Sequence, residues 1–380
     1  MNAVIHANIV LPDRILPDAS ILFDEKIFAI EPGNLVPEGT SILDAQGGYV
    51  TPGLIDTHIH GFGGADASDG STEGLLKMAS LLPQYGVTCF FPTTMTVSRT
   101  ELDRAFSSIR EAMKETAKPG SATALIAGCH AEGPFISPSK CGAQDPACAI
   151  SPELNLIEPY LDVIRILTLA PELEGAEKLI RTLREKTDLL ISVGHTSGGY
   201  DEAANAYRAG ATRVTHLFNA MTPLTHRAPG TVGAALSLPF FTELIADNIH
   251  VSPVLYPILD RLKEDKLILI TDCTRAGGLP DGRYTLGGQE FIKRDGACRL
   301  ENGTLAGSVL TMDRAVRDLF EAGIPLNRAV SAATLSAARS ARLENTGLIR
   351  EGFRADLVVW DRELHVKHTL REGRSIFSAE

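Results

Sequence analysis

Two histidines one residue apart, His58 and His60, end an apolar run in the segment TPGLIDTHIHG. On an extended strand, residues i and i+2 point to the same face, so both imidazole rings can reach one point in space. This spacing suits the binding of a metal ion. A pair of ordinary polar residues at the exit of a strand would have the same pattern, so the two histidines alone do not decide between these interpretations.

The elements that would position such a pair are a series of strand-like runs in the middle of the chain. Helical patterns such as RTELDRAFSSIREAMKET, with apolar residues at three- and four-residue spacing, lie between several of them. Strands that alternate with helices in this way predict an α/β fold, a closed (β/α)8 TIM-like barrel. The predicted strands are GLIDTHIH, VTCFFPTT, ALIAGCHAE, VIRILTLAPE, LLISVGHTS, RVTHLFNA, FTELIADNIH and LILITDCT.

Both ends of the chain have a different pattern, in which short apolar runs alternate with turn signals. Segments such as NAVIHANIVLPD near the start and ADLVVWDRELHVKHTLREGR near the end are typical of short antiparallel strands. We therefore expect residues 1–50 and 346–380 to form one small β-sandwich domain, and residues 51–345 to form the metal-dependent barrel.

In a (β/α)8 barrel, catalytic groups collect at the carboxyl ends of the strands. Metal-ligating and acidic residues occupy that position on five of the predicted strands. They are the nitrogen and oxygen ligands that Zn²⁺ or Fe²⁺ favours, and a carboxylate can bridge two ions. Because sulfur ligands are missing from the set, an open catalytic site that holds water is favoured over a closed structural one. The residues are His58, His60, Glu132, His195, His216 and Asp272.

The composition excludes several classes of protein. A net charge of -11 and a pI near 5.4, without a stripe of Lys and Arg, argue against a nucleic-acid partner. No apolar run approaches the length that spans a bilayer, and the first residues lack a signal-like pattern, so we expect a cytoplasmic protein with no membrane partner. The six cysteines contain no CxxC motif and are expected to be free thiols.

Several motifs together resemble the N-acetylglucosamine-6-phosphate deacetylase family of the amidohydrolase superfamily. HxH alone is a signal of the superfamily, whereas HAEGPF together with THLFNAM is specific to the deacetylases. The resemblance runs nearly end to end and includes the strands around ADLVVWD. The motifs are HIHG from His58, HAEGPF from His130, GHTS from Gly194, THLFNAM from Thr215, TDCTRAGGLPDG from Thr271 and LAGS from Leu305.

The resemblance implies hydrolysis of the acetamide of an N-acetyl amino sugar 6-phosphate, giving the amino sugar phosphate and acetate, with a metal-bound water as nucleophile. One or two divalent ions, Zn²⁺ or Fe²⁺, are implied. Glu132, His195 and His216 would hold the first ion. His58 and His60 would hold a second, with Glu132 as the bridge, and Asp272 would act as general base and then general acid.

The same resemblance places further residues at the small-molecule substrate. Arg227 and His250 would bind the sugar phosphate, and Arg227 would reach the neighbouring subunit's site, which implies a homodimer. The remaining substrate residues are Ala143, Gln144, Asn219, Ala220, Leu305, Ala306 and Gly307.

Gln144 is a departure from the family pattern. The chain reads KCGAQ where the family usually has KGAH, so Gln144 stands in place of a histidine associated with the acetamide carbonyl. Glutamine can donate a hydrogen bond to a developing oxyanion but cannot carry a positive charge. We therefore hypothesise a retained deacetylase with an altered preference, with the galacto epimer as the alternative substrate.

Two other function classes share parts of the pattern. A cyclic-amide or purine amidohydrolase would also have HxH, the later histidines and the aspartate, but dihydropyrimidinase-like members often use a lysine as the bridging group. Glu132 at the candidate bridging position favours the deacetylase. A non-catalytic binding barrel predicts the loss of a metal ligand or of the aspartate, and this sequence retains all of them.

Overall fold

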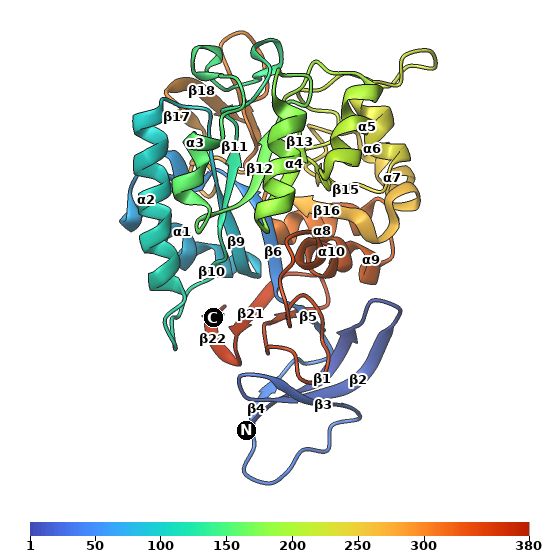
Figure 1. Ribbon diagram of the computed structural model, residues 1–380. Helices are drawn as coiled ribbons and strands as arrows, with labels where there is room; N and C mark the ends of the chain where they lie inside the picture. The colour runs from blue at the N-terminus through green and yellow to red at the C-terminus, as the bar shows by residue number, and fades with distance from the viewer. Residues whose placement is uncertain (380) are drawn as a thin grey trace.

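The apolar runs in the middle of the chain form eight parallel strands within residues 1–379, which are the residues that this computed structural model describes. Nearly every residue of these strands is buried, because helices cover the outer face of the barrel and side chains fill its interior. This arrangement confirms the predicted α/β barrel (Figure 1). The strands are β6 (Leu54–Ile59), β9 (Val87–Thr94), β11 (Cys129–Glu132), β12 (Ile164–Leu169), β13 (Leu190–Val193), β14 (Arg213–Val214), β15 (Phe241–Ile245) and β16 (Leu267–Ile270).

Parallel pairing runs from β6 through β9 and on to β16, and the short strand β10 (Leu125–Ile126) adds to β9. Between the last and first strands, the backbone N–H of Asp272 donates to the carbonyl oxygen of His58 at 2.9 Å. This bond brings the carboxyl ends of the two strands together and closes the barrel at the end where we expect the site.

Helices follow most strands and bury one face each. Ser98 begins α2 with a capping box, in which its hydroxyl oxygen accepts from the Glu101 N–H and the Glu101 carboxylate accepts from the Ser98 N–H. Leu102 and Phe106 then lie on the buried face. The helices are α1 (Thr72–Leu81), α2 (Arg99–Thr116), α3 (Leu154–Ile157), α4 (Ala176–Lys186), α5 (Tyr200–Ala209), α6 (Gly230–Ser237), α7 (Tyr256–Lys263), α8 (Met312–Glu321), α9 (Leu326–Ala333) and α10 (Leu335–Ser340).

Short 3₁₀ helices connect several of these elements. They are η1 (Ala67–Asp69), η2 (Leu82–Tyr85), η3 (Pro138–Lys140), η4 (Pro146–Cys148), η5 (Glu158–Tyr160), η6 (Pro253–Leu255) and η7 (Glu264–Lys266).

The two ends of the chain meet in a separate sheet with its own hydrophobic core, which includes Val4, Ile21, Val50 and Leu357. Most pairs are antiparallel as expected, but β1 pairs with β4 and β5 in parallel because the chain crosses back after β3. The strands are β1 (Asn2–Val10), β2 (Ile15–Phe23), β3 (Ile27–Pro32), β4 (Ser41–Asp44), β5 (Tyr49–Pro52), β20 (Leu357–Trp360), β21 (Val366–Arg371) and β22 (Arg374–Ser378). The domain boundaries remain a proposal, since β5 spans residue 50.

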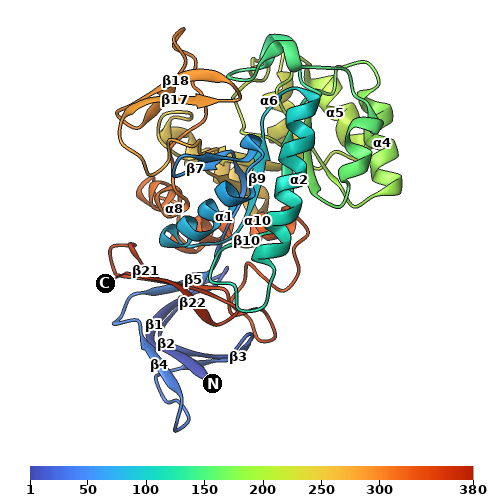
Figure 2. The same ribbon diagram turned by 90° about the vertical axis from the view of Figure 1, so that its left-hand side faces the viewer.

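A three-stranded antiparallel sheet follows β16 and lies at the end of the barrel opposite the terminal sheet (Figures 1 and 2). This sheet is not among the predicted elements. Its strands are β17 (Gly282–Leu286), β18 (Gln289–Arg294) and β19 (Ala297–Arg299). Two-residue turns, Gly287-Gly288 and Asp295-Gly296, connect these strands, and all four residues have positive φ. Gly-Gly and Asp-Gly are typical of such hairpin turns, so the hairpins could have been predicted from the sequence. A small hairpin, β7 (Gly61–Phe62) and β8 (Ala65–Asp66), follows β6.

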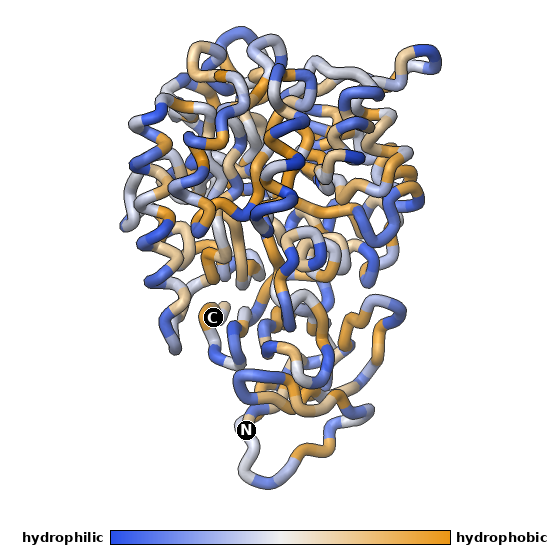
Figure 3. The backbone as a smooth tube through the Cα atoms, in the orientation of Figure 1, coloured by the Kyte–Doolittle hydropathy of each residue, from blue (hydrophilic) through white to orange (hydrophobic). Residues whose placement is uncertain are grey.

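The hydropathy of the chain follows these layers. Figure 3 shows mainly hydrophobic colouring along the inner strands and frequent hydrophilic segments on the outer helices and loops. Among the residues that the structure describes, every helix is too short or too polar to cross a bilayer.

Candidate metal centre and active site

The six predicted metal and acid residues all lie at the carboxyl end of the barrel. His58 belongs to β6 and Glu132 is the last residue of β11, while His195, His216 and Asp272 each follow their strand by two residues. These last three have positive φ angles of 47°, 27° and 51°. This left-handed conformation is unfavourable for residues with a Cβ atom, and such strain concentrates at functional sites.

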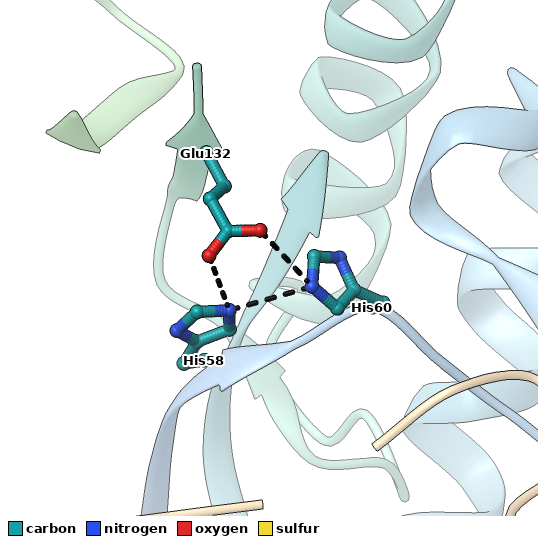
Figure 4. Close-up of side chains that lie close together, drawn as sticks. All are labelled: His58, His60 and Glu132. Atoms are coloured by element: carbon teal, nitrogen blue, oxygen red, sulfur yellow. Dashed lines mark hydrogen bonds and ion pairs between the residues drawn. The ribbon is translucent and has the colours of Figure 1, made fainter. Parts of the chain in front are cut away.

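Glu132 lies between two pairs of histidines. Its Oε1 atom is 3.0 Å from Nε2 of His216 and 3.2 Å from Nε2 of His195. On the other side, Oε1 is 3.4 Å from Nε2 of His58, and Oε2 is 3.4 Å from Nε2 of His60 (Figure 4). A carboxylate shared in this way has the position of a bridge between two ions.

The contacts of Nδ1, the ring nitrogen that points away from the centre, determine that Nε2 is the nitrogen that faces it in three of the histidines. Nδ1 of His60, His195 and His216 faces a main-chain carbonyl oxygen at 3.0, 2.8 and 3.1 Å. A carbonyl oxygen only accepts, so each Nδ1 carries a proton and donates it. Nε2 is therefore the atom that each of these rings offers to the centre, which is the arrangement that a metal-binding histidine needs.

The distances and charges of the centre fit a metal ion. Ligands of a tetrahedral ion at about 2.0 to 2.1 Å lie about 3.3 Å apart, and Nε2 atoms of His195 and His216 are 3.1 Å apart. The centre also favours positive charge. Burial disfavours a charged imidazole, but the hydrogen bond and the charge of Glu132 outweigh it and raise the pKa of His216 to about 9. A bound metal cation would supply this positive charge in place of the proton on His216.

Asp272 faces the His58 and His60 side of the centre. Its Oδ1 atom is 3.1 Å from Nε2 of His60 and 3.3 Å from Nε2 of His58. Burial disfavours the ionised carboxyl group, but the hydrogen bond from His60 and the charges of both histidines hold the pKa of Asp272 below its ordinary value. The side chain is therefore a carboxylate that can accept a proton.

A cavity of about 530 Å³ opens above the centre, with a volume suited to a small molecule. Most of the predicted residues line it, whereas His58 is fully buried beneath. The predicted residues at its wall are His60, Glu132, Ala143, Gln144, His195, His216, Asn219, Ala220, His250, Asp272, Leu305 and Gly307.

Gln144 is hydrogen-bonded to the carboxylate that the histidine pairs share. Its Nε2 donates to Oε2 of Glu132 at 2.6 Å, and its Oε1 accepts from the Thr96 N–H at 2.5 Å. The side chain is almost fully buried and reaches the cavity wall beside His195. Gln144 thus holds the shared carboxylate in addition to facing the cavity.

Two predicted substrate residues lie elsewhere. Ala306 is fully buried. Arg227 is exposed on the loop between β14 and α6, which projects from the barrel at the upper right of Figure 1, outside the cavity of its own chain. Whether Arg227 reaches a neighbouring subunit stays a prediction.

The structure adds two cationic residues at the cavity wall, Lys140 and Arg299. Lys140 ends η3 and was available to sequence reasoning, since it begins the KCGAQ motif. Arg299 ends β19 and forms an isolated bridge with Leu305, so only the hairpin pairing reveals that it lies at the cavity. The predicted cation His250 is paired with Asp247, with 2.6 Å between Nδ1 and Oδ2.

Beneath the centre lies a buried ion pair that the sequence analysis also missed. Nη2 of Arg213 is 2.7 Å from Oε1 of Glu243, and both side chains are fully buried. Burial disfavours the ionised carboxyl group, but the charges of His58 and Arg213 hold the pKa of Glu243 well below its ordinary value. Arg213 begins the short strand β14 and Glu243 lies within β15, and neither position by itself indicates a partner on another strand.

Residues 49–376 match the model of the amidohydrolase family. The chain is 37% identical to N-acetylglucosamine-6-phosphate deacetylase of Lysinibacillus sphaericus, over 89% of this chain and 88% of that protein. It is 35% identical to N-acetylgalactosamine-6-phosphate deacetylase of Escherichia coli O157:H7, over 92% of each.

The fold has close counterparts among solved structures. A Mycobacterium smegmatis N-acetyl-D-glucosamine-6-phosphate deacetylase variant, in complex with N-acetyl-D-glucosamine-6-phosphate, superimposes with a TM-score of 0.91 and 31% identity. The match covers 99% of each chain.

Proposed function

Because the chain belongs to the amidohydrolase family and, within it, to the amino sugar 6-phosphate deacetylases, we propose that it hydrolyses N-acetylglucosamine-6-phosphate to glucosamine-6-phosphate and acetate. The observation that carries this proposal is the position of Glu132 between two histidine pairs at the floor of the cavity. As the sequence predicts, we place the reaction in the cytoplasm.

The proposed metal ligands divide into two sets that share Glu132. His195 and His216 complete the first, and His58 and His60 complete the second, so the site has room for one or two ions. Imidazole and carboxylate ligands suit both Zn²⁺ and Fe²⁺. A divalent ion held there supplies Lewis-acid polarisation of the amide carbonyl and lowers the pKa of bound water.

Asp272 is the proposed proton carrier. Water adds to the carbonyl carbon of the acetamide, and the carboxylate accepts one of its protons. As the carbon–nitrogen bond breaks, the same carboxyl group returns the proton to the amine nitrogen, and acetic acid leaves to ionise as acetate. The contacts of Asp272 with His58 and His60 keep its carboxylate oriented toward the centre.

Cations at the cavity wall would bind the phosphate group. His250, Lys140 and Arg299 are supplied by the same chain, and we propose that Arg227 comes from a second subunit. A homodimer is supported by an exposed apolar row along η6 and α7. Val254, Ile258 and Leu262, spaced four residues apart, are 76%, 50% and 53% exposed, and a second copy of the chain would cover them.

The galacto epimer is the second candidate substrate. Gln144 occupies the position of the usual histidine, and one of the close relatives carries the name of a galactosamine enzyme. The two sugars differ in the orientation of one hydroxyl group, which only the cavity wall can distinguish.

The test is acetate release by protein of known metal content from both epimeric sugar phosphates. We expect release from N-acetylglucosamine-6-phosphate, with the galacto epimer measured beside it to rank the two. The sugar without its phosphate group serves as the control and should be a much poorer substrate. If neither sugar phosphate releases acetate from metal-loaded protein, the proposed function is wrong and only the amidohydrolase scaffold remains.

A further inference from the structure

Among the four histidines of the centre, His58 differs in the partner of its outer nitrogen. The other three donate from Nδ1 to main-chain carbonyl oxygens. Nδ1 of His58 instead lies 3.0 Å from Oε2 of Glu243, a side chain of β15 on the seventh barrel strand. His58 of the second proposed metal set therefore depends on a side chain that could be lost by substitution, whereas both histidines of the first set are held by main-chain carbonyl oxygens.

Glu243 is itself fixed on every side. Oε1 accepts from Nη2 of Arg213 at 2.7 Å, and Oε2 accepts from the His216 N–H at 3.2 Å. Arg213 also donates to Oγ1 of Thr57 at 3.0 Å and to the hydroxyl of Ser340. Glu243, Arg213 and His58 are all fully buried, so these contacts are shielded from water.

We propose that Glu243 is a positioning residue for the second metal ion: its carboxylate accepts a hydrogen bond from the Nδ1–H of His58 and so directs Nε2 toward His60, Glu132 and Asp272. The carboxylate fixes both the tautomer and the orientation of the ring, which outer partners of metal-binding histidines commonly do. Arg213 neutralises the carboxylate and allows it to be buried. This inference rests on the proposed metal-dependent function.

A different reading of the same residues is a separate ion held by His58, His130 and Glu243, whose donor atoms also lie close together. The contacts of His130 argue against it. Its Nδ1 lies 3.1 Å from the Thr57 carbonyl oxygen, and its Nε2 lies 2.7 Å from Oγ1 of Thr168. Both nitrogens of His130 are therefore already engaged, and Glu243 is already paired with Arg213.

The first metal set should survive the loss of Glu243. The ring of His216 is held through Nδ1 by the Asn219 carbonyl oxygen, and Gln144 holds Glu132. Only the backbone N–H of His216 contacts Glu243. Removal of the carboxylate should therefore weaken the second ion selectively.

The experiment compares Zn²⁺ binding by the full chain and by three variants, with ions per chain counted by atomic emission after equilibrium dialysis. Glu243→Leu removes the acceptor. Glu243→Leu with Arg213→Met removes both partners and leaves no unpaired buried charge. This variant should therefore fold even if Glu243→Leu alone does not. Glu243→Gln with Arg213→Met also removes the charge pair but keeps an acceptor oxygen for His58.

We expect two ions per chain in the wild type, and about 10- to 100-fold weaker binding of the second ion in both Glu243→Leu variants. The Glu243→Gln, Arg213→Met variant should bind the second ion nearly as well as the wild type. Circular dichroism checks that each variant is folded. A wild type that binds one ion overturns the inference, as does a folded Glu243→Leu, Arg213→Met variant that retains both. Equal loss in the Glu243→Gln, Arg213→Met variant also overturns it, because the pair would then act by packing.

Acetate release by the wild type separates this inference from the proposed function. If the wild type releases acetate and the Glu243 variants still bind two ions, only the role of Glu243 is refuted. If the Glu243→Leu variants lose only the second ion, but the wild type releases no acetate from either sugar phosphate, the proposed substrate is refuted and the role of Glu243 stands.

Discussion

Asp272 and His58 are joined through their backbones, since the N–H of Asp272 donates to the carbonyl oxygen of His58 at 2.9 Å. The proposed proton carrier and a proposed metal ligand thus come from the last and first strands of the barrel. Their side chains meet as well, with 3.3 Å between Oδ1 and Nε2. Closure of the barrel therefore assembles the reacting groups.

Asp272→Asn should reduce the rate of acetate release by about 10²- to 10⁴-fold, because an amide cannot accept the proton of the attacking water. Asparagine retains an oxygen near His60, so the metal content should change little. The measurement is kcat together with ions per chain. A variant that keeps wild-type kcat would show that another group carries the proton.

Arg299→Leu should raise KM for the sugar phosphate by about 3- to 30-fold with little change in kcat, because a charged hydrogen-bond donor at the cavity wall is lost. The matched control is Arg294→Leu. Arg294 is an exposed arginine of the same small sheet, outside the cavity wall. Equal KM values for the two variants would show that cations other than Arg299 bind the phosphate group of the substrate.

Arg227→Ala and Asp272→Asn should complement each other if Arg227 serves the neighbouring subunit. In a mixed dimer, the Arg227→Ala chain keeps its own Asp272 and receives Arg227 from its partner, so one site is complete. Each variant alone should be nearly inactive, and co-expressed chains should recover activity. Absence of recovery in purified mixed dimers would place Arg227 outside the neighbouring site.

Ile258→Glu should dissociate the proposed dimer, because it places a charge in the exposed apolar row of η6 and α7. Leu35→Glu is the control, since Leu35 is 94% exposed in the loop between β3 and β4, far along the chain from α7. Sedimentation velocity gives the mass of each species. A dimeric Ile258→Glu variant would move the interface to another surface.

Lys263 should make the free energy of unfolding depend on pH in alkaline solution. Burial lowers the pKa of its amine from 10.5 to about 8. Between these values the unfolded chain binds more protons than the folded one, so stability rises as pH increases from about 8 to 10.5. The shift alone corresponds to about 3 kcal/mol, and solvent screening of the partly hydrated amine reduces the gain to on the order of 2 kcal/mol.

Chemical denaturation at several pH values, with Lys263→Met as the reference, measures this gain. The amine also donates to the carbonyl oxygens of Ala235 and Leu238 at 2.6 and 2.9 Å, so the variant should be compared by its pH slope. Parallel slopes for the two proteins would contradict the lowered pKa.

Sequence reasoning reached the barrel because parallel strands covered on both faces are continuous apolar runs, and because His195, His216 and Asp272 stand just beyond such runs. It missed the parallel pairing of β1 with β4 and β5, since alternation of apolar residues does not record strand direction. It also missed β17 to β19, in which exposed and half-buried residues alternate and few are fully buried.

Side-chain pairs between neighbouring barrel strands could not be predicted from the sequence either. Glu243 is one acidic residue in FTELIAD, and Arg213 is one basic residue beside THLFNAM. Their pairing arises only when β14 and β15 lie side by side, because parallel strands bring distant residues together through register. Arg299 was missed for the same reason, since its bridge to Leu305 depends on a hairpin.

The terminal sheet has a consequence for synthesis on the ribosome. Strand β5 pairs with β1 on one side and with β20 on the other, and the whole barrel is translated between β5 and β20. At about 5 to 20 residues per second, one edge of β5 waits roughly 15 to 60 seconds for its partner. The nascent barrel therefore has time to form first, and an unpaired strand edge stays available to chaperones until β20 is made.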